Sequence, residues 1–152
     1  LSYKTDSFFE WMRAYNWVQE NQLLEISEKE KYAFSMYDNK FNISLIKIIS
    51  GEKCIGFIVL QQRNQVCKLL FSYFDPIEHT KTISDIIKLH TINSGGREII
   101  CYEKHIAKDL KTSNCIFKSY PMVKNSILSK KFNATDFDSV RMHFGDGDCS
   151  FA

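Results

Sequence analysis

The chain has 152 residues, the length of one ordinary domain, and 44% of them are hydrophobic and 25% charged. This composition excludes a disordered tail and a fibrous protein, and it is typical of a globular chain with its own core. The formal net charge of +2 is not gathered in a block of lysine and arginine, so we expect no nucleic-acid binding through charge. The longest apolar run, 54–60, is far shorter than the roughly 20 residues of a membrane span.

Cysteine usage indicates a reducing environment. The number of cysteines is odd, none are paired as Cys-x-x-Cys, and four of them lie in strand-like apolar runs. We therefore predict reduced core thiols, with neither a disulfide framework nor a zinc ribbon. Because no signal-peptide pattern is present either, we expect a cytoplasmic protein. The five residues are Cys54, Cys67, Cys101, Cys115 and Cys149.

A first helix is predicted near the N-terminus, where Ser7 and Glu10 form a capping box. Apolar side chains then recur at helical spacing and predict a stripe that faces the core: Phe8, Trp11, Met12, Tyr15 and Val18. Ser27 and Glu30 repeat the capping arrangement and predict a second short helix before the sheet begins.

Three apolar runs follow at residues 41–49, 54–62 and 66–74. Short polar connections separate them, and such connections usually join antiparallel neighbours. The middle run is apolar at nearly every position, which predicts a central strand covered on both faces. Gly56 within this run indicates a bulge or a close approach of another backbone.

The four residues from Asp75 to Glu78 are typical of a helix start. An acidic cap can receive the free amides, proline suits the first helical position, and a glutamate follows three residues after the cap. A Ser-Gly-Gly sequence at 94–96 should end this helix. Its inward stripe is predicted to contain Ile83, Ile86, Ile87 and His90.

The remaining elements complete a mixed fold. We predict a strand at 97–102, a short helix at 103–111 with Ile106, Ala107 and Leu110 inward, and a strand pair at 115–120 and 123–129 around Pro121. Residues 133–152 should be irregular, with one short strand at 137–142. The predicted fold class is α/β, with a mixed, mostly antiparallel central sheet flanked by helices.

The polar residues offer few candidates for chemistry. His79 and His105 follow helix starts and are interpreted as surface residues without partners, whereas His90 is interpreted as a core residue. Cys149 has no basic neighbour in sequence that would activate its thiol. Four aspartates near the C-terminus suggest a calcium loop, but their spacing does not fit an EF-hand and suits turns equally well, so no metal site is expected: Asp136, Asp138, Asp146 and Asp148.

The order of these elements resembles the GNAT acyltransferase superfamily, with antiparallel strands first and a crossover helix after the third. Local sequences are also similar to that family: Ile55-Gly56-Phe57 to its middle strand, and 99–110 followed by 114–117 to its fifth strand, fourth helix and next strand. Residues 9–18 and 145–151 are similar to the C-terminal half of two-domain bacterial proteins of the FemABX and CelD kind. The resemblance implies one GNAT-like domain over 1–152.

The resemblance also implies partners and site residues. Since the chain opens on Leu1 rather than Met, we expect an upstream GNAT-like domain of the same chain and a small-molecule or peptide acceptor. Tyr73 is expected to bind the acceptor. Tyr102 and Tyr120 lie near the position where relatives place a tyrosine acid for the departing thiolate. From the residues alone, Tyr102 and Tyr120 are also ordinary core or sheet-edge aromatics.

One segment departs from the family pattern. GNAT enzymes hold the coenzyme A pyrophosphate on backbone amides of a glycine-containing loop at a helix N-terminus. Asp75, Pro76 and Glu78 occupy that place here, so two carboxylates add negative charge and proline removes one amide. We therefore expect no cofactor in this domain, and acetyl-CoA or another acyl-CoA would bind elsewhere in a full-length protein.

Three hypotheses on function stay open. The first is that the chain supplies the acceptor-side half of an acyltransferase and is inactive alone. The second is a non-catalytic GNAT-like module that binds a ligand or a protein. The third, which the altered loop disfavours, is a self-sufficient acetyltransferase.

Overall fold

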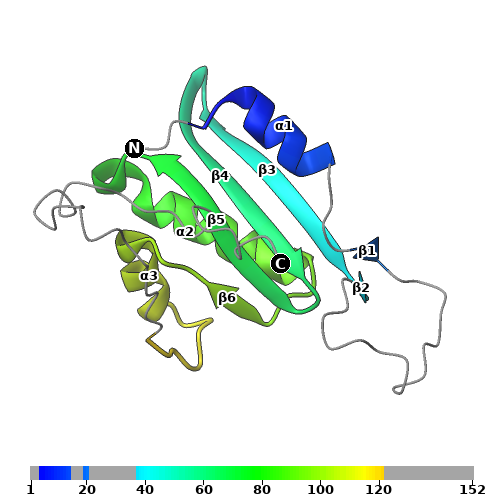
Figure 1. The fold of residues 1–152 in the computed structure, drawn as a ribbon. Helices are drawn as coiled ribbons and strands as arrows, with labels where there is room; N and C mark the ends of the chain where they lie inside the picture. The colour runs from blue at the N-terminus through cyan, green and yellow to red at the C-terminus, as the bar shows by residue number, and fades with distance from the viewer. Residues whose placement is uncertain (1–3, 15–18, 21–36, 122–152) are drawn as a thin grey trace, which may run out of the picture.

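A computed structural model describes residues 4–14, 19–20 and 37–121 of the chain. These residues form a mixed α+β fold, as predicted from the sequence, with helices on both sides of a mostly antiparallel sheet (Figure 1). The elements in chain order are α1 (Asp6–Ala14), β1 (Gln19–Glu20), β2 (Tyr37–Asp38), β3 (Phe41–Ser50), β4 (Lys53–Arg63), β5 (Val66–Phe74), α2 (Pro76–Asn93), β6 (Glu98–Ile100) and α3 (Lys104–Lys111).

In the described part of the chain, four strands form one sheet in the order β3-β4-β5-β6. β3, β4 and β5 are antiparallel neighbours, which confirms the three predicted strands and their pairing. β6 runs parallel to β5, and α2 is the crossover between them. The two hairpin turns are tight, and each contains a left-handed residue: Gly51 at φ 60° and Asn64 at φ 52°. β1 and β2 form a separate parallel pair.

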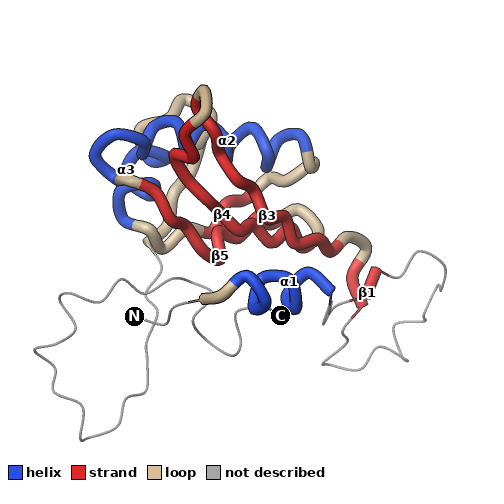
Figure 2. The backbone as a smooth tube through the Cα atoms, turned by 90° about the horizontal axis from the view of Figure 1, so that it is seen from above, coloured by secondary structure: helices blue, strands red, loops and turns tan. Residues whose placement is uncertain are grey.

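The sheet is the middle of three layers (Figure 2). α1 covers one face, and α2 and α3 cover the other. Because β4 lies between β3 and β5 and under helices on both faces, Ile58, Val59 and Leu60 are each 0% exposed. The predicted central strand is therefore confirmed.

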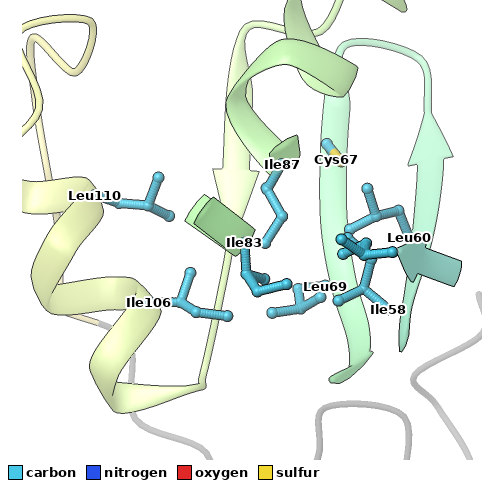
Figure 3. Close-up of a cluster of buried hydrophobic side chains, with 9 residues drawn as sticks. Ile58, Leu60, Cys67, Leu69, Ile83, Ile87, Ile106 and Leu110 are labelled. Carbon is cyan, nitrogen blue, oxygen red and sulfur yellow. The ribbon is translucent and has the colours of Figure 1, made fainter. Parts of the chain in front are cut away.

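Two hydrophobic clusters join the layers, one on each face of the sheet. Full burial of one large aliphatic side chain stabilises the folded state by about 1.5–3 kcal/mol, so each cluster contributes substantially to the free energy of unfolding. The cluster under α2 and α3 contains Ile48, Ile58, Leu60, Cys67, Leu69, Ile83, Ile87, Ile106 and Leu110 (Figure 3). The cluster under α1 contains Phe9, Met12, Phe41, Ile43, Val59, Leu70 and Phe71.

The bulge predicted at Gly56 is confirmed, whereas the tight contacts there are with side chains and not with another backbone. A shift in the β3–β4 register leaves Ile55 as an extra residue in β4, directly beside the glycine. A Cβ added to Gly56 would lie 3.0 Å from Ile83 Cδ1 and 3.3 Å from Phe74 Cβ. α2 therefore packs closely on the end of β4 where β5 leads into the helix.

The first helix differs from its prediction. It begins one residue before Ser7, so the capping box expected there is wrong. Its buried side chains are Phe9 and Met12, whereas Trp11 is 40% exposed. Successive helical residues are rotated by about 100°, so a helix that turns Phe9 and Met12 toward the sheet must turn Trp11 away.

The elements after α2 agree with the sequence only as far as α3. A strand and a capped helix are present as predicted, and Ile106 and Leu110 are buried. The strand predicted at 115–120 is wrong, because these residues are turn or coil. Phe117 is 99% exposed and Tyr120 67% exposed, and the described residues pair no strand with this segment. Without a neighbouring strand, an extended segment has no partner for its backbone groups.

Some predictions concern residues outside the described ones. These are the inward positions Tyr15 and Val18, the second helix at Ser27 and Glu30, the strands at 123–129 and 137–142, the four C-terminal aspartates and Cys149. Among the helices that the structure does describe, none is both long and apolar enough to cross a membrane.

Candidate functional site

Aromatic side chains from α1, β4 and β5 meet on the face of the sheet that α1 covers. Phe57 and Tyr73 are paired across the two strands, with ring centroids 6.3 Å apart and planes inclined by 26°. Phe9 approaches both rings edge-on, 5.1 Å from Phe57 and 6.5 Å from Tyr73. Tyr73 stays 39% exposed. The residue predicted to bind substrate is thus held by two other rings and presents part of its own to solvent.

The same surface continues along α1. The rings of Phe8 and Trp11 are 6.3 Å apart, and Trp11 is 40% exposed. Lys4 Nζ lies 4.7 Å from the ring centroid of Phe8 and 5.9 Å from that of Phe71, in the range of cation–π attraction. The chain's own Lys4 thus already lies over two of the rings on this face. We call this set the aromatic surface: Phe8, Phe9, Trp11, Phe57 and Tyr73.

The start of α2 follows directly after β5. Asp75 caps the helix, and its Oδ1 accepts the N–H of Ile77 at 2.8 Å and that of Glu78 at 3.4 Å. Pro76, the first helical residue, has no N–H to offer. Glu78 adds a second carboxylate to this turn, 3.5 Å from His79 Nε2. The predicted cap is confirmed. The N-terminus of α2 is acidic, and the amides of Ile77 and Glu78 are bonded to the Asp75 side chain.

Tyr102 lies two residues after β6 and is half-buried. The next residue, Glu103, caps α3: its Oε2 accepts the N–H of Ile106 at 2.7 Å, and its Oε1 is 3.0 Å from His105 Nδ1. The interpretation of His105 as a histidine without a partner is therefore wrong. It is also wrong for His79, whose side chain is 21% exposed and lies 3.5 Å from Glu78. For Glu103 and His105, the sequence shows only a Glu-x-His spacing at a helix start, and this spacing alone does not determine the contact.

Tyr120 lies in the coil after α3, not in a strand as predicted. Its side chain is 67% exposed, and Lys118 Nζ lies 4.8 Å from its ring centroid. The three tyrosines predicted as site residues thus occupy three different settings: Tyr73 belongs to the aromatic surface, Tyr102 precedes the Glu–His pair, and Tyr120 lies on the solvent side of a loop.

The cysteines of the described residues are free, and of these Cys67 is buried in the core while Cys101 is partly buried against it. Cys54 and Cys115 are exposed, so the prediction of core thiols is wrong for them. Burial raises the pKa of the Cys67 thiol, partly offset by a hydrogen bond to Thr91. Burial also raises the pKa of Cys101 to about 12. The thiols of Cys67 and Cys101 are therefore protonated and unreactive at neutral pH.

His90, predicted to be a core residue, is half-buried on α2. Burial lowers its pKa, and the positive charge of Lys40 lowers it further. Within residues 4–14, 19–20 and 37–121, no cluster of three or more His, Cys, Asp and Glu side chains is arranged to hold a metal ion.

Comparisons with protein families, with curated proteins and with solved structures found no match to this chain.

Proposed function

We propose that this chain is a GNAT-like domain that contributes the acceptor-side half of an acyltransferase. Its element order supports the proposal, because antiparallel β3, β4 and β5 are followed by the crossover helix α2 and the parallel strand β6. A register shift also leaves Leu70 as an extra residue in β5. This is similar to the bulged strand that precedes the donor loop in the superfamily.

The aromatic surface is the observation that carries the acceptor role. Tyr73 is exposed near the carboxyl end of β5, two residues before the cap of α2, and Phe57 and Phe9 hold its ring in place. A ring held in this way loses little conformational freedom when a ligand stacks on it. A small-molecule or peptide acceptor with an apolar or aromatic part would bind there.

The acidic start of α2 argues against a donor site in this domain. Pyrophosphate binds at helix N-termini because free N–H groups and the helix dipole favour negative charge. Here Asp75 occupies those N–H groups, and Glu78 adds a second negative charge. A like-charge contact of this kind costs on the order of one to several kcal/mol. The acyl donor, acetyl-CoA or another acyl-CoA, would therefore be bound by an upstream GNAT-like half.

Tyr102 and Tyr120 are the proposed proton donors to the departing thiolate. A phenol that is half-buried, as Tyr102 is, can be oriented by its surroundings, whereas Tyr120 is 67% exposed. We therefore assign the role first to Tyr102. The exposure of Tyr120 favours a second candidate function, a non-catalytic module that binds a ligand or a protein.

Two measurements on the 152-residue chain test the acceptor role. Titration with aromatic amines and short peptides, followed by NMR, should shift the amide signals of Phe57 and Tyr73. Tyr73→Ala should weaken the binding about tenfold, the equivalent of about 1.4 kcal/mol, while Phe117→Ala, at a 99% exposed side chain outside the aromatic surface, should leave it unchanged. Equal weakening by both substitutions, or no shifts on the aromatic surface, would reject the proposal.

A thermal melt with acetyl-CoA tests the missing donor site. A ligand at about a hundred times its Kd stabilises a protein by about 2.7 kcal/mol, which moves the melting temperature of a domain this size by several degrees. We expect no rise. A clear rise would instead support a self-sufficient acetyltransferase. In a protein that also carries the upstream half, Tyr102→Phe should slow acyl transfer, and acceptor binding without any transfer would favour the binding module.

A further inference from the structure

β3 is an outer strand of the sheet, and one side of it has no partner in the described part of the chain. The strand order is β3-β4-β5-β6, so β3 pairs with β4 alone. Within residues 4–14, 19–20 and 37–121, only β4 forms backbone hydrogen bonds with residues 42–50. An outer strand directs alternate N–H and C=O groups away from the sheet, so residues 42–50 present a row of donors and acceptors there (Figure 1). We call this side of residues 42–50 the free edge.

The two outer strands differ in the features that keep a sheet from pairing with other chains. Such features are short strands, charged side chains, prolines and bulges. β6 is short, Glu98–Ile100, and begins with a charged residue. β3 is long, Phe41–Ser50, contains no proline and carries one charge, Lys47. The register shift between β3 and β4 puts the extra residue in β4, so β3 itself stays regular. The free edge is therefore suited to receive another strand.

The free edge is also complementary to itself. Its central residue is Ile46, so a two-fold axis there pairs the whole free edge with that of a second copy, antiparallel and with opposite residues on the same face of the sheet. Ile49, which is 58% exposed, would lie opposite Ile43, a member of the cluster under α1. Lys47 would lie opposite Leu45, so two identical edges meet without like charges directly opposite each other.

From these observations we infer that two copies of this chain associate through the free edge, which joins their two sheets into one. The occupant is a second copy because Lys47 is the single charge of the free edge, so an acidic or basic partner strand would find little to pair with. A two-fold axis perpendicular to the sheet leaves both copies of α1 on the same face. The aromatic surfaces of both copies would then lie on one side of the joined sheet. The inference does not depend on the proposed acyl transfer.

The oligomeric state gives the first test. Light scattering during size-exclusion chromatography of the 152-residue chain should give the mass of two copies when the protein is concentrated. Ile49→Lys adds a second charge to the free edge and should raise the Kd of the dimer about tenfold or more. The control is Leu89→Lys on α2, which packs on β4, β5 and α3; Leu89 is 59% exposed, much like Ile49. This substitution should leave the Kd unchanged.

Single copies at every concentration, or equal weakening by the two substitutions, would overturn the inference. Circular dichroism shows whether both variants are folded, which their exposed positions favour.

Amide hydrogen exchange locates the contact in the native chain without any substitution. The amides of the free edge that point away from β4 should exchange slowly in concentrated protein and faster after dilution, whereas those of β6 should not change. A dimer whose free edge exchanges equally fast at both concentrations would overturn the inference. So would a protein with the upstream half in which the free edge is protected in a single copy, because that half would then be the occupant. Neither measurement uses an acceptor or a thioester, so failure here would leave the proposed function standing.

Discussion

Gly56 of β4 lies so close to Ile83 of α2 that a Cβ on the glycine would be 3.0 Å from Ile83 Cδ1. The same atom would be 3.3 Å from Phe74 Cβ and 3.4 Å from the Tyr73 carbonyl oxygen. Gly56→Ala therefore overpacks this contact between sheet and helix. We expect a loss of about 1–3 kcal/mol in the free energy of unfolding, measured by urea denaturation.

A second substitution shows whether the loss comes from the predicted contact. Ile83→Val removes Cδ1, the nearest of the three atoms, so Gly56→Ala should destabilise the Ile83→Val chain less than the native one. Equal losses in the two backgrounds would show that Ile83 is not what opposes the added methyl group.

The cap of α2 gives a prediction about stability. Asp75→Ala removes the acceptor of the Ile77 and Glu78 amides and should lower the free energy of unfolding by about 1 kcal/mol. Asp75→Asn keeps an oxygen acceptor and caps about as well, so it should cost much less. Thermal melts of the two variants make the comparison, and equal midpoints would contradict the assigned cap.

The sequence predicted the sheet and α2 well because their signals are local. Each strand of the β3–β4–β5 meander is an apolar run between polar turns, and Asp75-Pro76 carries both features of a helix start. The prediction of a strand at 115–120 was wrong because a strand also needs a neighbouring strand, which apolar composition alone does not supply. The prediction that Trp11 faces the core was wrong because packing against the sheet determines which face of α1 is buried.

The candidate site was predictable only in part. Tyr73 was proposed as a site residue from its place in a resemblance, but the rings of Phe9 and Phe57 that hold it come from a different helix and strand. The contact between Glu103 and His105 depends on the side-chain conformation at a helix cap, which residue spacing alone does not determine. Sequence therefore indicated where α3 starts and missed what its cap binds.

The core under α2 can be tested with two identical substitutions on one helix. Ile87 is 0% exposed and belongs to the cluster under α2 and α3, whereas Ile92 is 61% exposed. Ile87→Ala should cost about 2–5 kcal/mol in urea denaturation through lost burial and a cavity. Ile92→Ala should be near neutral, because alanine is also the better helix former. A large loss from Ile92→Ala would mean that its side chain is covered in solution.

Cys101 should make the stability of the fold fall at high pH. Burial raises its pKa from the ordinary value of 9.0 to about 12 in the folded state. Between these values the unfolded thiol loses its proton and the folded one keeps it, so the unfolded state binds fewer protons and the free energy of unfolding decreases as pH rises. The contribution is complete below about pH 9 and is lost as the pH approaches about 12.

Replacing this thiol should flatten that decline. Cys101→Ala removes one of the groups that resist ionisation, so its free energy of unfolding should fall less steeply above about pH 9 than that of the native chain. Cys115→Ala is the matched control, because Cys115 is exposed and should leave the slope unchanged. Urea denaturation at a series of pH values measures both slopes. Lysine and tyrosine titrate in the same pH range in every variant, so the difference between the slopes reports the cysteine alone. Parallel curves for Cys101→Ala and the native protein would mean that this thiol ionises as readily in the folded state as in the unfolded state.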